Sequence, residues 1–213
     1  TFANHPRQVL DTSFRPRLLT CLSQKIERFE QSPIEYCVLL PFTKELSLLS
    51  AREFMKVLHE EYHVQTLFVG HDHHFGHSKN EGFQEYCQYG KEFGMRVMQS
   101  KALTEDGVSV SSTLIRSCLC EGKIELANSY LGYHYYLTGT VVDGRKVGRP
   151  LGFPTANIQP LCADKLLPAL GVYAVYVYLG GKRYEGMLNI GSCPTVHDGD
   201  KSITVEVHIL DFE

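Results

Sequence analysis

The sequence predicts two domains of different class: an α/β domain with a parallel sheet over residues 1–131 and an all-β domain over residues 132–213. Helical and strand-like segments alternate in the first part, which is typical of a parallel sheet with helices on both faces. Beyond Gly132, strand-like segments follow one another without a helical period, as in a small antiparallel barrel or sandwich.

Helix signals divide the first domain. Ser50–Glu53 has the form of a capping box and begins a helix, whereas Gly94 and Gly132 follow two others as C-terminal stops. Ser111 or Ser112 caps a helix that runs to Cys120. The helices are expected over residues 22–29, 51–58, 82–93, 111–120 and 124–131.

Short apolar runs predict the strands of the same domain. Residues 36–40 end at Pro41 and are expected to form a buried strand, and residues 66–69 end at Gly70. A further strand is expected over residues 95–98. In the second domain the expected strands are 135–142, 172–179, 183–190 and 203–209, with Gly180-Gly181 as a hairpin turn between two of them.

Composition limits the classes of function. The net charge of −3 and the pI near 6.3 argue against a general nucleic-acid binder or anionic-membrane binder. No apolar run is long enough to span a bilayer, so no membrane association is expected. The seven cysteines include no Cys-x-x-Cys pair and are interpreted as reduced thiols of a cytoplasmic protein. The chain begins without Met on a strand-like Thr1-Phe2-Ala3 and closes on Asp211-Phe212-Glu213, just past another strand, so truncation at both ends is expected.

The most informative segment joins the first two strands of the second domain. Gly144, Gly148 and Gly152 suit a backbone that approaches a ligand closely. Thr155 and Asn157 follow two residues apart, so in an extended chain both side chains face the same way. Their oxygens can converge on a hard cation or a phosphate. A rigid turn with a polar exit is the alternative interpretation.

Two segments of the first domain carry chemistry. The loop Gly70–His77 follows a strand, where ligands of α/β sheets bind, and Asp72 is its candidate contact; zinc binding by its histidines, or a solvated loop, are alternatives. The segment Ser111–Arg116 opens a helix, whose free N–H groups and hydroxyls form an anion site. Ordinary N-capping accounts for one serine but not for Arg116.

These segments resemble the adenylyltransferase half of bacterial bifunctional riboflavin kinases/FAD synthetases. The similarity rests on Ser-Ser-Thr-x-Ile-Arg, on Gly-x-Asp-x-x-Phe-Gly and on the opening Thr-Phe-x-x-His-Pro-Arg. It implies a Rossmann-like nucleotidyltransferase domain in which Ser112, Thr113 and Arg116 contact ATP phosphates. Asp72 would lie in the nucleotide or FMN pocket, with His5 nearby. The family's Gly-x-Phe-Asp-Gly-x-His-x-Gly-His segment does not occur in this sequence.

The second domain is similar to the riboflavin kinase barrel of the same family. The similarity extends over residues 139–157, Asn189-Ile190-Gly191-x-x-Pro194-Thr195 and the strand 205–212. It implies that Glu206 is the general base on the riboflavin 5′-hydroxyl. Thr155 and Asn157 would hold Mg²⁺, and four residues would approach the phosphates of ATP: Gly144, Gly148, Gly152 and Pro154.

The resemblance therefore implies phosphorylation of riboflavin to FMN and adenylylation of FMN to FAD. ATP, riboflavin, FMN and FAD would be the substrates and products. The alternatives are a kinase whose adenylyltransferase domain is inactive and a non-catalytic flavin or nucleotide binder.

Overall fold

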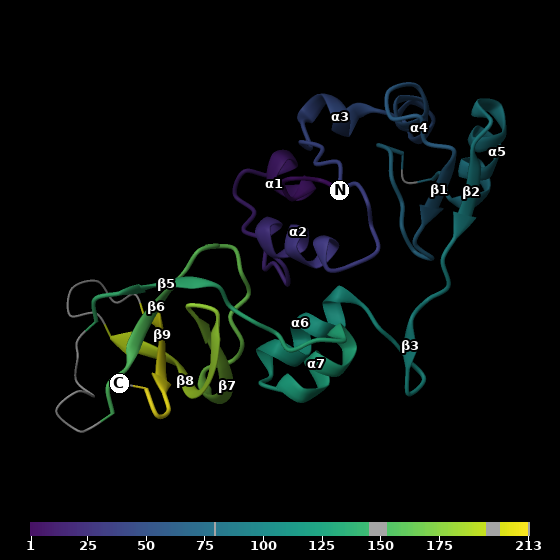
Figure 1. The fold of residues 1–213 in the computed structure, drawn as a ribbon. Coiled ribbons are helices and arrows are strands. Elements are labelled where there is room, and N and C mark those ends of the chain that lie inside the picture. The colour runs from purple at the N-terminus through teal and green to yellow at the C-terminus, as the bar shows by residue number, and fades with distance from the viewer. Residues whose placement is uncertain (79, 145–152, 195–200, 213) are drawn as a thin grey trace. The chain divides into compact units, whose positions relative to one another are not determined.

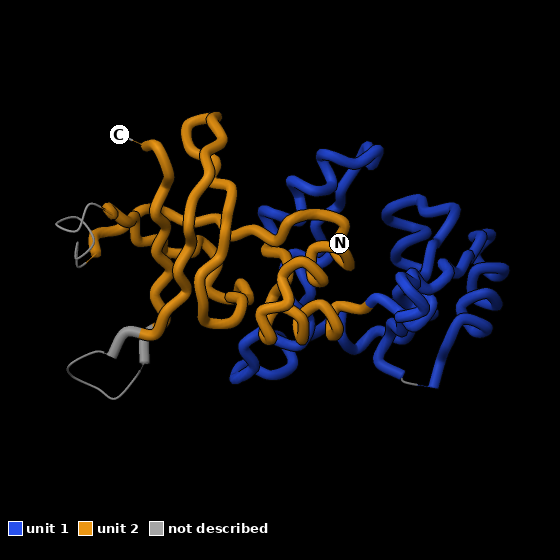
Figure 2. The backbone as a smooth tube through the Cα atoms, turned by 90° about the horizontal axis from the view of Figure 1, so that it is seen from below, with its two compact units in different colours: residues 1–16, 22–110 blue, residues 17–21, 111–213 orange. Residues whose placement is uncertain are grey.

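The computed structural model describes every residue except 79, 145–152, 195–200 and 213 (Figure 1). The described residues form two compact units, one of residues 1–16 and 22–110 and one of residues 17–21 and 111–213 (Figure 2). The helices at 112–131 therefore group with the second unit, although the sequence suggested a domain boundary after residue 131.

Unit 1 contains parallel strand pairs, as the alternating pattern predicted. Strand β1 (Thr66–Val69) pairs with β2 (Arg96–Gln99) over four residues. A second parallel contact joins Phe2 to Leu40, and the amide of Ala3 donates to the Leu40 carbonyl at 2.8 Å. The helices of this unit are α1 (Pro6–Leu10), α2 (Leu22–Glu30), α3 (Lys44–Leu48), α4 (Ala51–Glu60) and α5 (Phe83–Phe93), of which α1 and α3 were not predicted.

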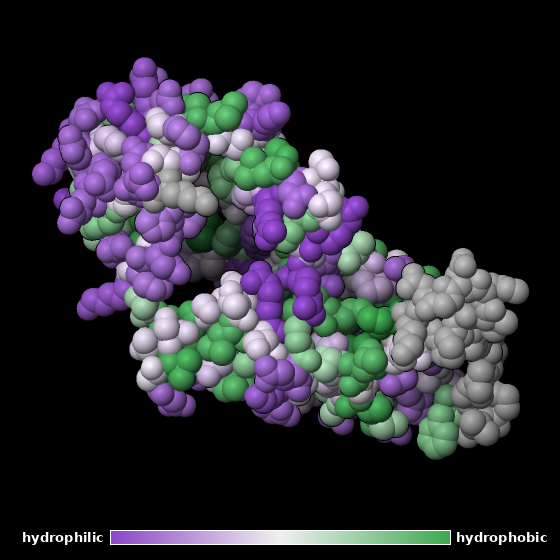
Figure 3. Space-filling model, turned by 180° about the vertical axis from the view of Figure 1, so that it is seen from behind, coloured by the Kyte–Doolittle hydropathy of each residue, from purple (hydrophilic) through white to green (hydrophobic). Residues whose placement is uncertain are grey.

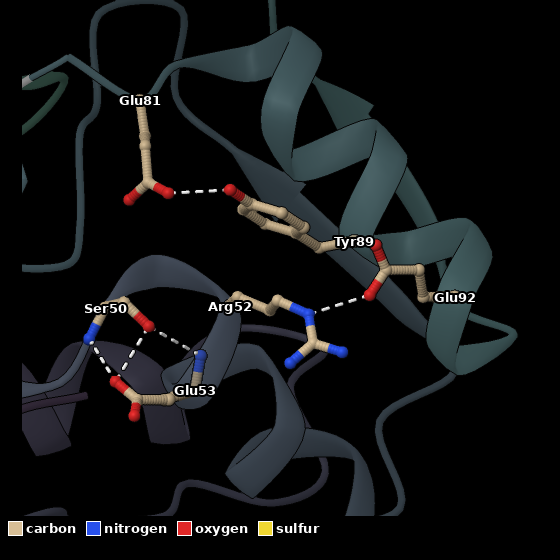
Figure 4. Close-up of polar contacts among 6 residues, drawn as sticks. All are labelled: Ser50, Arg52, Glu53, Glu81, Tyr89 and Glu92. Carbon is tan, nitrogen blue, oxygen red and sulfur yellow. Dashed lines mark hydrogen bonds and ion pairs between the residues drawn. The ribbon is translucent and has the colours of Figure 1, made fainter.

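The predicted capping box begins α4. The amide of Glu53 donates to Ser50 Oγ at 3.2 Å, and the amide of Ser50 donates to Glu53 Oε2 at 2.8 Å (Figure 4). Arg52 of α4 forms an ion pair of 2.7 Å with Glu92 of α5. Because both side chains are exposed, this pair adds little stability, and burial of apolar side chains must hold the two helices together.

The core of unit 1 lies between α4, α5 and the parallel strands. Its buried members are Ala51, Met55, Val69, Tyr86 and Met95. Tyr86 has no exposed surface, and its hydroxyl accepts from the Phe75 amide at 3.2 Å. The same hydroxyl lies 3.2 Å from the carbonyl oxygens of Phe75 and Glu81. A buried hydroxyl with these partners holds the loop before α5 against the helix.

We expect Tyr86→Phe to lower the free energy of unfolding by about 1–2 kcal/mol, because the Phe75 amide loses its buried acceptor. The midpoint of thermal unfolding then falls by roughly 2–4 °C per kcal/mol for a chain of this size. Chemical denaturation of wild type and variant measures the difference. Tyr62→Phe, at a partly exposed tyrosine, is the matched control. Equal losses in the two variants would contradict the role of the Tyr86 hydroxyl.

The burial predicted for residues 36–40 is wrong. Tyr36 is 86% exposed, Val38 and Leu39 are also exposed, and only Leu40 makes a strand bridge. An apolar run is buried only where other elements cover it, and the described residues leave these three side chains uncovered. A short hairpin later in the chain was not predicted: β3 (Thr104–Glu105) and β4 (Val108–Ser109) flank Asp106-Gly107, both at positive φ.

Unit 2 contains a five-stranded antiparallel sheet in the order β5-β6-β9-β8-β7 (Figure 1). Gly180 and Gly181, at φ 58° and 77°, make the predicted hairpin turn. The class of the sheet is confirmed, while closure into a barrel stays a prediction, because β5 and β7 are the sheet edges among described residues. The strands are β5 (Gly139–Val142), β6 (Ala156–Pro160), β7 (Gly171–Leu179), β8 (Lys182–Pro194) and β9 (Lys201–Ile209); β6 was not predicted.

The two faces of this sheet differ in burial. Val205 and Val207 are buried on the inner face, as the alternation in the last strand predicted, and Ile190 of β8 is buried opposite Val205. Ile203 departs from the pattern and is exposed. Polar side chains of β9, including Glu206, are on the outer face. Apolar side chains also reach the molecular surface (Figure 3), and on the outer face Tyr178 and Val172 are the most exposed of these.

Helices α6 (Ser112–Cys120) and α7 (Ile124–Leu131) complete unit 2 and end as predicted. Residues 17–21 pair with the connection between β6 and β7. The amide of Leu18 donates to the Asp164 carbonyl at 2.8 Å, and the amide of Leu166 donates to the Leu18 carbonyl at 2.9 Å. Lys165 is 8% exposed, and its Nζ donates to the Leu19 carbonyl at 2.6 Å.

Burial lowers the pKa of Lys165 to about 8, although the Leu19 carbonyl and the ring of Tyr135, 4.1 Å from Nζ, favour the ammonium form. The unfolded chain therefore binds a proton between pH 8 and about 10.4 that the folded chain has lost, so this residue's contribution to stability rises with pH there. The contribution of the neighbouring Cys21 to stability falls as the pH rises, because burial raises the pKa of its thiol to about 12.

We expect the stability of wild type relative to Lys165→Met to increase from pH 7.5 to pH 10. The comparison with the variant removes most of the Cys21 contribution, which both proteins share. Urea denaturation at each pH measures the difference in free energy of unfolding. A pH-independent difference would contradict the lowered pKa. Lys182→Met, at an exposed lysine of β8, is the control, and its difference from wild type in free energy of unfolding should be the same at each pH in this range.

Candidate active sites

Three polar side chains form a row across the outer face of the five-stranded sheet. Asn157 of β6 is directly opposite Glu206 of β9, and Asn189 of β8 is opposite Glu206 on the other side. Directly paired residues of antiparallel strands point to the same face, with Cβ atoms about 5 Å apart. Val142 and Val172 occupy the two ends of this row. The carboxylate thus stands between two carboxamides.

Thr155, immediately before β6, contacts the same carboxylate. Its hydroxyl donates to Glu206 Oε2 at 3.2 Å. A hydroxyl has one proton and two lone pairs, so this bond leaves oxygen lone pairs free for a cation. The structure therefore brings together three residues that the sequence analysis singled out: Thr155, Asn157 and Glu206.

Contacts between His208 of β9 and the residues just before β6 hold the backbone around this site. His208 Nδ1 lies 2.8 Å from the carbonyl oxygen of Pro154, and because a carbonyl only accepts, Nδ1 carries the proton. The ring of Phe153 packs edge-on against His208, with the ring centroids 5.6 Å apart. These contacts attach the segment before β6 to β9, which keeps Thr155 beside Glu206.

Gly144 leaves room for the amide of Asn157. A Cβ atom at position 144 would lie 1.9 Å from Asn157 Nδ2 and 2.4 Å from its Cγ, which no real structure tolerates. Only glycine therefore fits beside Asn157 in this conformation. The other two glycines of the predicted phosphate loop, Gly148 and Gly152, lie outside the described residues.

The donors at this site suit a magnesium ion that ATP brings with it. Mg²⁺ prefers oxygen ligands and retains several waters or phosphate oxygens, so it needs few ligands from the protein. Thr155 and Asn157 supply a hydroxyl and an amide oxygen, and the carboxylate of Glu206 lies beside them. A different kind of metal site, made of three or more His, Cys, Asp or Glu residues, is absent from the part of the chain that the structure describes. The histidines described in the loop after β1 therefore form no such cluster.

Two residues of the predicted AMP-transfer site are in unit 1. His5 caps α1, and its Nδ1 accepts from the Arg7 amide at 3.2 Å. Asp72 follows β1 as predicted; its side chain is 79% exposed, and Oδ1 lies 3.5 Å from His71 Nδ1. A cap explains the position of His5, whereas Asp72 is accessible to a ligand.

The other three residues are on α6 in unit 2. Ser111 is the N-cap and accepts from the Leu114 amide at 3.2 Å, so Ser112 and Thr113 occupy the first helical positions with exposed side chains. Arg116 Nε donates to the carbonyl of Arg17 at 2.8 Å. Arg116 therefore has a structural partner, while its terminal guanidinium nitrogens remain as possible phosphate donors. Because these residues and those of unit 1 belong to different units, their joint role stays a prediction.

Two features of unit 2 could not be assigned a role from the sequence. Asn189 was recognised within a motif, but its position beside Glu206 follows from the register of β8 and β9, which a single sequence does not show. The buried Lys165 and its contacts with residues 17–21 have no local signal, since the paired segments are more than 140 residues apart in sequence.

Comparison with known protein families gives two matches that together cover most of the chain. A riboflavin kinase model matches residues 131–213, and an FAD synthetase model matches residues 1–114. Proteins named bifunctional riboflavin kinase/FMN adenylyltransferase are similar to this chain along almost its whole length. The protein of Buchnera aphidicola is 34% identical over 99% of this chain and 68% of its own. That of Listeria monocytogenes is 37% identical over 100% of this chain and 67% of its own.

A solved structure from Streptococcus pneumoniae has the same fold. That protein is named a macrolide-efflux protein, and it aligns with a TM-score of 0.88 and 27% identity over 100% of this chain and 68% of that one. The chain spans about two thirds of the length of the relatives it matches.

No helix among the described residues is long and apolar enough to cross a membrane.

Proposed function

Because the chain belongs to the family of bifunctional riboflavin kinases/FMN adenylyltransferases, we propose that Glu206 is the base of its kinase reaction and that residues 1–131 carry the transfer of AMP to FMN. The family's two activities convert riboflavin to FMN and FMN to FAD, with ATP as the second substrate of each. The observation that supports the kinase assignment best is the contact of Thr155 with Glu206, with Asn157 directly opposite.

Glu206 removes the proton from the 5′-hydroxyl of riboflavin. The freed oxygen forms a bond to the γ-phosphorus of ATP, the bond from that phosphorus to the β–γ bridging oxygen breaks, and ADP leaves. A primary alcohol is a poor nucleophile, so a base within hydrogen-bond reach accelerates this step by about 10²–10⁴-fold. Most of the remaining catalysis is positioning of the two substrates.

Thr155 and Asn157 would hold the Mg²⁺ that accompanies ATP. That magnesium ion would neutralise part of the phosphate charge. Thr155 also orients the carboxylate by donating to Oε2. Gly144 leaves room for the Asn157 amide. The residues proposed to contact the phosphates, Gly148, Gly152 and Pro154, follow it in the sequence.

In the adenylyltransferase reaction, we assign Ser112, Thr113 and Arg116 to the ATP phosphates and Asp72 to the nucleotide or FMN pocket. Exposed amides and hydroxyls at the start of α6 suit an anion. His5 is assigned to the neighbourhood of this pocket, where it also caps α1. A cytoplasmic location, expected because the cysteines are interpreted as reduced thiols, stays a prediction.

A time course of flavins tests the proposal. The purified full-length protein is incubated with riboflavin, ATP and Mg²⁺, and the flavins are separated at intervals. FMN followed by FAD supports both activities, whereas FMN alone supports a kinase whose adenylyltransferase half is inactive. Flavin binding without either product would leave a non-catalytic binder and overturn the proposal. Omission of Mg²⁺, with EDTA present, should stop FMN formation.

A further inference from the structure

Asn157 and Asn189 occupy equivalent positions on the two sides of Glu206. Each is in register with the carboxylate, one on β6 and one on β8. Each also lies beside a glycine. A Cβ atom at Gly144 would lie 1.9 Å from Asn157 Nδ2, and one at Gly191 would lie 3.2 Å from Asn189 Nδ2. A larger residue in place of either glycine would therefore crowd the neighbouring carboxamide.

The two sides of Glu206 differ in what they offer a substrate. On the β6 side, Thr155 and Asn157 provide the oxygens assigned to the magnesium ion that accompanies the phosphates of ATP. In an in-line transfer the attacking oxygen and the leaving oxygen are on opposite sides of the phosphorus. With the phosphates on the β6 side, the alcohol approaches Glu206 from the β8 side, where Asn189 is the neighbouring side chain.

The chemistry of Asn189 suits a polyol. Its carboxamide both donates and accepts, as a hydroxyl does, so the two groups can form a pair of hydrogen bonds. The side chain is exposed and makes no hydrogen bond with the residues that the structure describes. Beyond it in the same row is Val172, 70% exposed, which offers apolar surface on the side away from Glu206. A substrate with a hydroxylated chain and an apolar ring fits this order.

We propose that Asn189 binds the secondary hydroxyl next to the reacting primary alcohol of the flavin side chain, and so orients that alcohol toward Glu206. This inference rests on the proposed kinase function and adds the acceptor side of its site. Asn157 serves the phosphate donor and Asn189 the acceptor, so substitution at the two positions raises KM for different substrates.

Steady-state FMN formation by the full-length protein tests the assignment. We expect Asn189→Ala to raise the KM for riboflavin about tenfold, since it loses hydrogen bonds to a hydroxyl, and to leave the KM for ATP within about twofold. Gln159→Ala is the matched control: it removes an exposed carboxamide from the same face of β6, away from Glu206. An unchanged riboflavin KM in Asn189→Ala, with circular dichroism showing a folded protein, would overturn the proposal.

A substrate analogue separates a direct contact from an indirect one. A flavin without the secondary hydroxyl next to the reacting alcohol should lose about tenfold in kcat/KM with wild type, and little further with Asn189→Ala. If the loss caused by the analogue and the loss caused by Asn189→Ala multiply when the two are combined, they are independent, which would contradict a direct contact between Asn189 and this hydroxyl.

Flavin binding, followed by fluorescence quenching without ATP, separates this inference from the proposed function. If wild type forms no FMN, the kinase assignment fails, and weaker flavin binding by Asn189→Ala would still support the contact. Equal binding by wild type and Asn189→Ala would overturn it.

Discussion

Glu206→Gln is expected to lower the rate of FMN formation by about 10²–10⁴-fold while ATP binding is retained. Glutamine has the same shape and can still contact Thr155, but its carboxamide cannot take a proton from an alcohol. The loss should therefore appear in kcat rather than in the KM for ATP. Single-turnover formation of FMN and a separate measurement of ATP affinity distinguish the two effects.

Glu185→Gln is the matched control for this variant. Glu185 is an exposed glutamate on the neighbouring strand β8, so the same change of charge is made on the same sheet at a distance from the site. Its FMN formation should equal that of wild type. Undiminished turnover by Glu206→Gln would exclude Glu206 as the base, whereas equal losses in both variants would point to a general effect of charge.

Gly144→Ala is expected to reduce kcat/KM for ATP by about 10²-fold. The added Cβ would lie 1.9 Å from Asn157 Nδ2, so the amide must leave its position or the backbone of residue 144 must move. A displacement of about 1 Å at a positioning residue is enough for a loss of this size. Because Gly144 does not have a positive φ, the backbone itself tolerates alanine, and the effect reports the displacement of Asn157.

The control for Gly144→Ala is Gly82→Ala. A Cβ at Gly82 meets its nearest atom at 3.7 Å, an ordinary contact, so the same substitution introduces no collision there. Kinase rates over a range of Mg²⁺ concentrations measure both variants. Gly144→Ala should require more Mg²⁺ for half-maximal activity. A normal Mg²⁺ requirement would contradict the assignment of Asn157 to the metal.

Local signals in the sequence predicted most of the secondary structure. The capping box at Ser50 and the glycine stops at Gly94 and Gly132 lie where predicted, because a cap depends on a few adjacent residues. The glycine turn at 180–181 is also local. Strand β6 was missed because its residues Ala156–Pro160 have no apolar alternation and directly follow a segment rich in glycine and proline.

Burial was less predictable than secondary structure. The apolar run at 36–40 was expected to be buried, yet Tyr36, Val38 and Leu39 are exposed, since burial depends on the elements that pack over a strand. Lys165 shows the reverse: a lysine is rarely buried, but Leu19 and Tyr135 provide partners from distant parts of the chain.

The sequence by itself determined the candidate residues Thr155, Asn157 and Glu206, because each belongs to a motif that can be recognised along the chain. Only the tertiary structure decided that they meet. Pairing of β6 with β9 puts Asn157 opposite Glu206, and pairing of β9 with β8 adds Asn189. The physical reason is that strand register arises from backbone hydrogen bonds between separate segments of the chain, so the motifs alone do not show which of their residues become neighbours.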